Sequence, residues 1–235
     1  MTLNTNQKQL RRKLLTHLYN AHTSHIGSCL SVIDIIDSIY QTKNNNEKFV
    51  LSNGHAGAAL YVVLEKFKYI LNADLIKYNV HPDRNEKKGI DVSTGSLGQG
   101  LPIAVGMALA NKTNVYCLIS DGECAEGSIW ESLKIIHDLN ITNIKIFASI
   151  NGFGAYDPIN SLDLKKKFTG FGFKIIEIDG HNPKQIKNAL AIKQKYPTLI
   201  FAKTNSCQLP FLNGIDAHYY TMKDCDYELA MEELK

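Results

Sequence analysis

The sequence predicts an α/β fold in which a parallel sheet is covered by helices on both faces, giving three layers. Short apolar runs alternate along the chain with longer segments of helical periodicity. The run IKIFASI at 144–150 is almost wholly apolar, as expected of a strand that is buried on both faces of a sheet. No proline- or glycine-rich linker divides the 235 residues, so we expect a single domain over residues 1–235.

Hydrophobic periodicity and local start signals define the individual elements. Leucines recur at helical spacing in residues 6–19, and Ser31 with Asp34 has the spacing of a capping box, which predicts the start of a second helix there. Further helices are predicted over residues 56–67, 98–110, 127–139, 183–192 and the acidic stretch 227–235; the small-residue-rich segment 98–110 is expected to be buried. Strands are predicted over residues 48–51, 115–119, 144–150, 174–178 and 198–202. Residues 44–46 and 77–93 are expected to be loops.

Composition narrows the class of protein. The 26 basic and 23 acidic residues give a net charge of +3 without a charged block, which argues against a nucleic-acid or membrane-surface partner. The sequence predicts neither a signal peptide nor a membrane-spanning segment. The 5 cysteines never form a CxxC pair, which favours reduced thiols in the cytoplasm over disulfides or a zinc site.

Polar dipeptides follow two of the predicted strands directly. The strand 115–119 runs into Asp121-Gly122, and the strand ending at Ile150 runs into Asn151-Gly152. Because one helix and one strand separate Asp121 from Asn151, a parallel crossover can bring both side chains to one crevice at the carboxyl edge of the sheet. Their oxygens, with a backbone carbonyl, suit Mg²⁺ completed by an organic phosphate. Each dipeptide alone is also a common turn after a strand.

Four histidines lie in short polar or glycine-containing segments: His25, His55, His81 and His218. Loop histidines that converge on a crevice can donate to phosphate or carbonyl oxygens and transfer protons near neutral pH. Each one alone also fits a hydrogen-bonded surface or core residue. The glycine cluster TGSLGQG at 94–100 opens a helix and fits either a tight turn or a cofactor contact. The residues themselves therefore indicate an α/β protein that binds a metal-linked phosphate compound.

The motifs resemble, in order, those of the N-terminal thiamine-diphosphate domain of transketolases. They are SHIGSCLS, FVLSNGHAGAALY, HPDRNEKKGIDVSTGSLGQGLPIAVGMALA, SDGECAEGSIWESL, a following Asn151, IDGHN and AKTNSCQLPFLNGIDAHYY. The resemblance implies that Asp121, Asn151 and the carbonyl of Phe153 hold Mg²⁺ or Ca²⁺ on the cofactor diphosphate. It also implies that Gly122 and His55 contact the diphosphate.

The same resemblance implies roles for further residues. Gly95 and Leu97 match residues that line the cofactor, and Glu126 matches a buried acid near the cofactor and the subunit interface. Three histidines match residues that face the substrate or assist proton transfer, the last also touching the diphosphate: His25, His81 and His218.

The implied reaction is transfer of a two-carbon ketol unit from a ketose, usually phosphorylated, to an aldose. A full transketolase also carries a pyrimidine-binding domain, with a glutamate that activates the cofactor, and a third domain. Residues 1–235 do not encode these parts. The resemblance therefore implies that the partner is a separate C-terminal subunit, in an assembly of two heterodimers, with sugars or sugar phosphates as substrates and with neither nucleic acid nor membrane as partner.

Several positions depart from the family pattern. Ser24 and Ser120 stand where the family has glycine, Ser96 where it often has proline, and Ala155 where a larger apolar residue contacts the cofactor. The stretch AKTNSCQLP lacks the usual glycine-lysine-glycine run. Three alternatives stay open: another two-chain thiamine-diphosphate enzyme, such as an unusual-sugar or deoxyxylulose-phosphate-type synthase; a non-catalytic binding or regulatory relative; and an unrelated Mg²⁺-dependent phosphate-ester enzyme built around Asp121.

Overall fold

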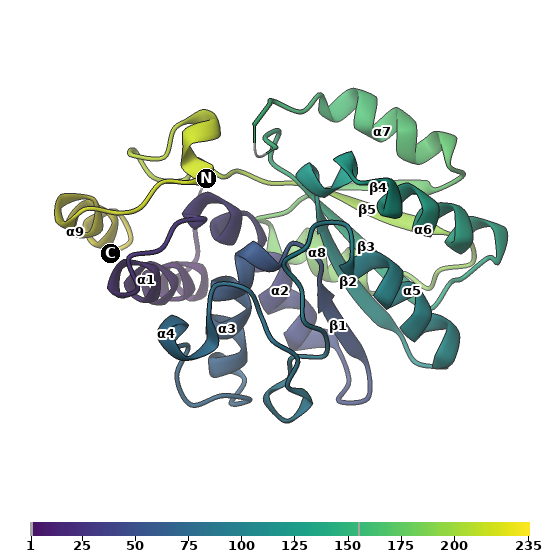
Figure 1. Ribbon diagram of the computed structural model, residues 1–235, viewed down its shortest axis with the longest axis horizontal. Coiled ribbons are helices and arrows are strands. Elements are labelled where there is room, and N and C mark those ends of the chain that lie inside the picture. The colour runs from purple at the N-terminus through teal and green to yellow at the C-terminus, as the bar shows by residue number, and fades with distance from the viewer. Residues whose placement is uncertain (1, 155) are drawn as a thin grey trace.

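A computed structural model describes residues 2–154 and 156–235 of the chain (Figure 1). The strands are β1 (Lys48–Leu51), β2 (Val115–Ser120), β3 (Ile144–Ile150), β4 (Lys174–Asp179) and β5 (Thr198–Lys203). The α-helices are α1 (Thr5–Asn20), α2 (Ile26–Thr42), α3 (Gly57–Lys66), α4 (Leu75–Tyr78), α5 (Gly100–Ala110), α6 (Gly127–Asp138), α7 (Ser161–Gly170), α8 (Pro183–Leu190) and α9 (Asp224–Glu233). Short 3₁₀ helices are η1 (Gly54–Ala56), η2 (Glu86–Lys88), η3 (Gly122–Ala125) and η4 (Gly214–His218).

The strands form one sheet in the order β1-β2-β3-β5-β4, and every neighbouring pair is parallel. This confirms the predicted fold class. The register pairs Ser120 of β2 with Ser149 of β3, so the two strands end at nearly the same level. The residues that follow these strands, Asp121 and Asn151, therefore emerge side by side at the carboxyl edge.

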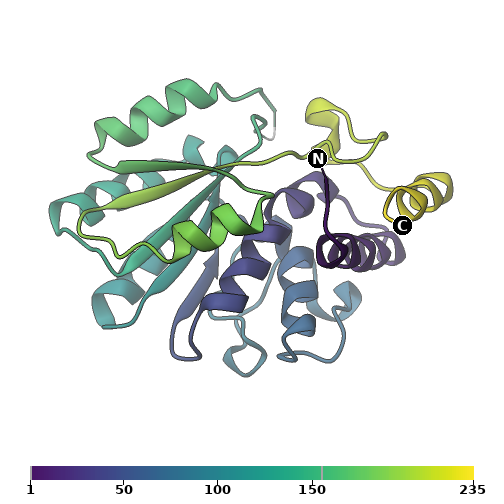
Figure 2. The same ribbon diagram turned by 180° about the vertical axis from the view of Figure 1, so that it is seen from behind.

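Successive side chains of each strand point to opposite faces of the sheet and pack into two hydrophobic cores, one on each face. Tyr116 and Leu118 of β2 point into the core with α2, α3 and α8, whereas Cys117 and Ile119 point into the core with α5, α6 and α7. Figures 1 and 2, which view the molecule from opposite sides, show these two sets of helices on opposite faces of the sheet. Helix α9 packs against α1 beyond the first set, where Arg12 donates to the carbonyl of Met231 at 2.7 Å.

The predicted start of the second helix is wrong. Helix α2 begins at Ile26, with His25 as its N-cap, and Ser31 and Asp34 lie inside it. The Ser31 hydroxyl donates to the carbonyl of Gly27 at 2.9 Å, and Asp34 accepts from the Arg11 guanidinium. Both polar side chains thus have partners within the fold and do not cap a helix end.

Two other segments differ from expectation: α5 is apolar all round yet exposes one face, and α7 buries too few side chains to give a clear helical pattern. Helix α5 is buried on one face only: Ile103 and Leu109 of its other face are 41% and 56% exposed. Helix α7 was not predicted; it buries only Leu164 and Phe168, and Asn160 caps its first turn. The other predicted helices and strands are present with small shifts at their ends, and 77–93 is mainly loop, apart from the end of α4 and the short η2.

Over the described ranges 2–154 and 156–235, no helix has the length and apolarity needed to cross a membrane. The five cysteines are free thiols, and Cys29 and Cys117 are buried in the two cores. Burial raises the pKa of both thiols, which keeps them protonated at neutral pH.

Candidate functional site

A cavity of about 480 Å³ opens at the carboxyl ends of β2 and β3, between the start of α2, η3 and η4. This is where an open parallel sheet binds its ligands. Most residues that the sequence assigned to the site line this cavity: His55, Leu97, Asp121, Gly122, Glu126, Asn151, Phe153 and His218. His25, His81 and Gly95 lie next to the cavity and outside its lining.

Asp121 and Asn151 meet as their positions after neighbouring strands predict. The Asp121 Oδ2 atom accepts from the backbone N–H groups of Asn151 at 2.9 Å and Gly152 at 2.7 Å, and Oδ1 accepts from Gly122 N–H at 3.0 Å. Gly152 has φ +86°, a conformation that favours glycine and turns its N–H toward the carboxylate. The Asp-Gly and Asn-Gly turns therefore form one joined structure.

The buried environment of Asp121 makes its negative charge costly unless a positive charge lies nearby. Burial raises its pKa to about 6, even though hydrogen bonds from Gly152, Gly122 and Asn151 act in the opposite direction. A cation bound to this carboxylate would offset the burial penalty. Asp121 is thus suited to hold a metal ion.

The donor set fits Mg²⁺ with an anionic ligand. Asn151 and Phe153 line the cavity with Asp121, and the Asn151 amide oxygen, which accepts from Phe153 N–H at 2.9 Å, keeps a second lone pair. A carboxylate, an amide oxygen and a backbone carbonyl are hard oxygens that suit Mg²⁺ or Ca²⁺. Across the described part of the chain, no group of three His, Cys, Asp or Glu side chains could hold a metal by itself. One carboxylate leaves a bound Mg²⁺ with excess positive charge, which an anionic ligand such as a diphosphate would balance. Among the described residues, a Cβ on Gly122 would meet Gly154 Cα at 3.6 Å and Ser120 Oγ at 3.9 Å, both ordinary van der Waals distances, which leaves room there for a ligand.

Sequence reasoning missed Glu123, the fourth residue of the Ser-Asp-Gly-Glu turn. Its carboxylate is fully buried and accepts from Ser52 Oγ at 2.6 Å, Gly98 N at 3.0 Å and Ser120 N at 3.0 Å. It thereby joins the ends of β1 and β2 to the glycine segment. Burial raises the pKa of Glu123, and these hydrogen bonds partly offset the effect.

The glycine segment 94–100 is a tightly packed turn. Gly98 has φ +79°, and a Cβ there would lie 2.6 Å from the Glu126 Cβ. Gly95 has φ +152°, and a Cβ there would lie 2.9 Å from the His81 ring. Leu97 is among the residues that line the cavity, and Gly95 is not. Close packing accounts for both glycines without a ligand.

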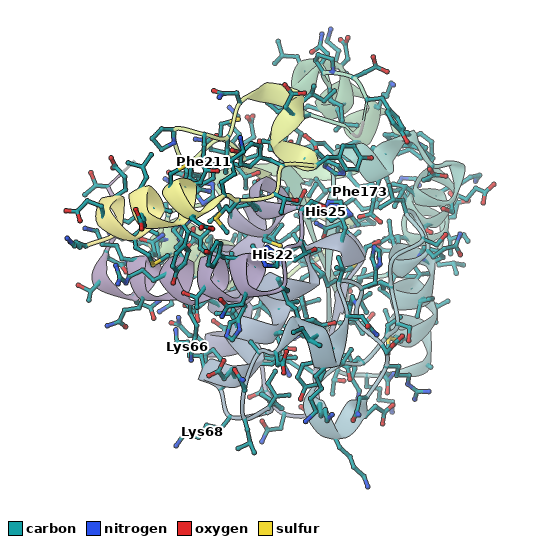
Figure 3. The ribbon with its side chains drawn as sticks, turned by 60° about the vertical axis from the view of Figure 1, so that its left-hand side comes forward. His22, His25, Lys66, Lys68, Phe173 and Phe211 are labelled. Atoms are coloured by element: carbon teal, nitrogen blue, oxygen red, sulfur yellow. The ribbon has the colours of Figure 1, made fainter. Side chains whose placement is uncertain are left out.

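Three of the four predicted histidines form a cluster. The ring of His25 lies 5.1 Å from that of His55 and 4.8 Å from that of His218, measured between centroids. His25 has φ +67°, an uncommon conformation for a residue with a side chain, and its N–H donates to the carbonyl of His218 at 3.2 Å. In Figure 3 His25 lies where α2 starts, beside the segment that carries η4.

Burial determines the charge of this cluster. It lowers the pKa of His25 to about 4 and of His55 to about 3, and the neighbouring histidines, His81 among them, add to both shifts. Burial also lowers the pKa of His218. The rings are therefore neutral at pH 7, and each can donate at one nitrogen and accept at the other.

Three buried polar atoms near the cluster have no hydrogen-bond partner among the described residues: His25 Nδ1, Asn53 Oδ1 and Thr94 Oγ1. Buried polar groups are almost always paired, with protein, ligand or ordered water, so these atoms mark places where a further partner can bind. Asn53 itself lines the cavity.

At two positions, the burial or the hydrogen bonding of the side chain differs from what the family resemblance implies. Glu126, implied to be a buried acid, is exposed because it begins α6 at the rim of the cavity with nothing covering it; its burial would need a second chain. Ser120, in place of a glycine, uses its hydroxyl to accept from Glu123 N at 3.3 Å. Ala155 lies outside the described residues.

Comparison with known proteins gives a consistent set of similarities. The sequence matches the family described as transketolase, thiamine diphosphate binding domain, over residues 5–230. It is 34% identical to the transketolase of Homo sapiens, over 78% of this chain and 34% of that protein. It is 30% identical to one of the subunits of the apulose-4-phosphate transketolase of Actinobacillus succinogenes, over 97% of this chain and 94% of that polypeptide.

The solved structures agree with the sequence matches. The crystal structure of transketolase from Campylobacter jejuni superposes with a TM-score of 0.82 at 26% identity, over 98% of this chain and 42% of that chain. The chain therefore spans about a third of the length of the human transketolase and nearly all of the shorter Actinobacillus polypeptide.

Proposed function

The chain belongs to the transketolase family, as its thiamine-diphosphate-binding domain, and from this we propose that it is the diphosphate-binding subunit of a two-chain transketolase. Together with a separate pyrimidine-binding subunit, it transfers a two-carbon ketol unit from a ketose or ketose phosphate to an aldose. Thiamine diphosphate, when bound, supplies the electron sink for carbon–carbon bond cleavage. The chain itself binds and orients the reactants and moves protons.

The joined ends of β2 and β3 support the cofactor assignment. Asp121, the Asn151 amide oxygen and the Phe153 carbonyl would hold Mg²⁺, or Ca²⁺, on the diphosphate, and Gly122 and His55 would contact the phosphate oxygens. Leu97 would contribute an apolar part of the cofactor wall. Gly95 would contribute to the cofactor site indirectly, because the absence of a side chain there allows the His81 ring to pack against the backbone.

The histidine cluster supports a role in proton transfer. Neutral imidazoles at His25 and His218 can donate to a sugar hydroxyl or carbonyl oxygen and accept a proton in return. The unpaired Nδ1 of His25 is available for such a contact. His81, which packs against Gly95 outside the cluster, is the third histidine that would act on the substrate.

The matched lengths support a separate partner. The chain aligns with 94% of a polypeptide that is named as one part of a transketolase, but with only 34% of a single-chain transketolase. We therefore infer that a second polypeptide covers Glu126 and provides the remaining cofactor contacts, in an assembly of two heterodimers. The free cysteines fit a cytoplasmic enzyme.

The observation that carries this proposal is the junction of Asp121 with Asn151 and Gly152 beside the histidine cluster in one cavity. The test mixes the chain with a purified pyrimidine-binding partner subunit, to be sought first in the neighbouring reading frames, together with Mg²⁺ and thiamine diphosphate. Donors are a panel of ketose phosphates, including apulose 4-phosphate, and the acceptor is an aldose phosphate. Mass spectrometry should find an acceptor extended by two carbons.

Other products distinguish the alternatives. When a 2-oxo acid such as pyruvate is added as donor, a product formed with loss of its carboxylate as carbon dioxide would indicate a deoxyxylulose-phosphate-type synthase. Calorimetry that finds no saturable cofactor binding by the pair would indicate a non-catalytic relative. Hydrolysis of a phosphate ester that needs Mg²⁺ but no thiamine diphosphate would indicate an enzyme built around Asp121 alone.

A further inference from the structure

A buried polar cluster lies where α1, α2, the β4–α8 turn and the chain after β5 meet, and none of its members lines the cavity. Gln7, Arg11, Asp34 and His181 are each at least nine-tenths buried. The Arg11 guanidinium binds both carboxylate oxygens of Asp34, at 3.0 and 2.6 Å. Ionised groups this deep are costly to bury, and the proposed reaction does not use them.

The hydrogen bonds of His181 define its tautomer. Its Nδ1 lies 2.8 Å from Asp34 Oδ2, an ionised acceptor, so Nδ1 carries the proton. Its Nε2 accepts from the backbone N–H of Asn205 at 3.0 Å. Burial raises the pKa of Asp34, but the hydrogen bonds from Arg11 and His181 outweigh it and hold that pKa below its usual value.

A second contact ties the same chain segment to α2. Gln208 Nε2 donates to the carbonyl of Leu30 at 3.0 Å and to that of Asn205 at 2.7 Å, and Gln208 Oε1 accepts from Arg11 Nε at 2.9 Å. Asn205 and Gln208 lie in residues 204–213, which have no regular secondary structure. Core packing of Leu209 and Leu212 and the backbone hydrogen bond from Thr204 to the carbonyl of Ile150 hold parts of this segment. The hydrogen bonds of Asn205 and Gln208 tie it further to His181 and α2.

The tethered segment leads directly to the site. Ser206, Gly214 and His218 line the cavity, and η4 ends at His218. The segment packs tightly on the first turn of α2: a Cβ on Gly27 would lie 3.0 Å from both Ser206 Cβ and the Ser206 carbonyl oxygen. A shift of the segment would therefore move His218 relative to His25. The carbonyl oxygen of His218 accepts a hydrogen bond from the backbone N–H of His25.

We propose that His181, oriented by Asp34 and Arg11, is a positioning residue that holds the segment 204–218 against α2 through Asn205 and so sets the place of His218 beside His25. The effect of His181 on catalysis rests on the proposed function. The hydrogen bonds that hold the segment 204–218 do not depend on that function.

Two variants of His181 separate its two hydrogen bonds. In His181→Asn the amide nitrogen can replace Nδ1 and keep Asp34 paired, but the contact to Asn205 is lost; in His181→Gln the amide oxygen can replace Nε2 and keep Asn205 paired. Lys145→Met is the matched control, because Lys145 is also a buried polar tie, to the carbonyls of Leu190 and Ile192, near the opposite end of the sheet.

Two measurements on the full chain report the position of His218. Hydrogen exchange of residues 204–218 should rise about tenfold in His181→Asn, and the imidazole NMR signals of His25 and His218 should shift. His181→Gln and Lys145→Met should resemble the wild type in both. Equal effects of the two His181 variants, or none in His181→Asn, would overturn the proposal.

A further variant guards against misfolding. Should His181→Asn not fold, Gln208→Met removes the partly buried second tie and should raise exchange in the same segment; unchanged exchange there would overturn the proposal. In the reconstituted pair, His181→Asn should lower kcat/KM about tenfold to a hundredfold, and His181→Gln should restore most of it. Lack of turnover by the wild-type pair would count against the proposed function alone, because exchange and NMR need no turnover.

Discussion

Asp121 is the residue on which the proposed metal site depends. Its carboxylate joins the ends of β2 and β3 and is almost fully buried, so its charge needs a cation nearby. Asp121→Asn keeps the shape but removes the charge. We expect it to weaken binding of Mg²⁺ and thiamine diphosphate by the reconstituted pair at least about a hundredfold in calorimetry, because metal ligands matter more than their supporting residues.

The matched control is Asp163→Asn. Asp163 lines the same cavity from α7 but is exposed and pairs with Lys166 at 3.5 Å. Its neutralisation should leave cofactor affinity within a factor of about two, since an exposed pair contributes little. Tight cofactor binding by Asp121→Asn would contradict the metal assignment.

The buried histidines predict a pH dependence of stability. His55 has a pKa of about 3 in the folded chain, below its ordinary value of 6.5, so between these values the unfolded chain binds more protons. Stability should therefore rise with pH through this window and lose this dependence above 6.5. Asp121 acts in the opposite direction between 3.8 and about 6, because its pKa is raised.

Comparison with His55→Gln isolates the histidine contribution. Urea unfolding at several pH values should show a smaller rise of the unfolding free energy between pH 4.5 and 6.5 in the variant, since Asp121 contributes equally to both proteins. Parallel curves for the two proteins would show that His55 is not held neutral by burial.

The contacts of a site residue were predictable from the sequence where its partner follows a neighbouring strand of the sheet. Asp121 and Asn151 follow adjacent strands, so their meeting follows from the strand pattern. Glu123 was missed because its partners Ser52 and Gly98 come from other strands and loops. His181 was missed for the same reason, since Asp34 is 147 residues away in the sequence.

At the scale of elements, helix α5 contains a matched pair of glycines. A Cβ on Gly100 would lie 2.5 Å from Ser52 Cα, whereas a Cβ on Gly106 would meet nothing within 4 Å. Gly100→Ala should therefore destabilise the chain by about 1–3 kcal/mol through overpacking. Gly106→Ala should stabilise it by about 0.5–1 kcal/mol, because alanine loses less backbone entropy in a helix.

Urea denaturation of the two variants measures both effects under one condition. Opposite signs would support the packing of the glycine segment against the end of β1. Equal and small effects would indicate that Gly100 does not pack closely against Ser52 at the end of β1.

The elements themselves were predictable where burial is nearly complete. The apolar runs of β2 and β3 needed no further information, because strands covered on both faces must be apolar throughout. The start of α2 was missed because His25 caps it without a side-chain hydrogen bond, in a conformation that carries no sequence signal. Helix α7 escaped prediction because only Leu164 and Phe168 mark its buried face.

At the scale of the whole molecule, the chain folds two cores around a complete parallel sheet but leaves its cavity open to one side. The exposed Glu126, together with unpaired buried atoms at His25, Asn53 and Thr94, lies where a second chain or a ligand would complete the contacts. The two cores lie on opposite faces of the sheet, so a stable fold is compatible with the proposed need for a second chain at the cavity.

We propose that a second polypeptide completes this active site, and a complementation titration measures that requirement. Ketol transfer is measured at saturating Mg²⁺ and thiamine diphosphate while the purified pyrimidine-binding protein is added to a fixed amount of the chain. We expect no transfer by either protein alone, and activity that rises to a plateau at equimolar partner. Ketol transfer by the chain without any second protein would contradict it.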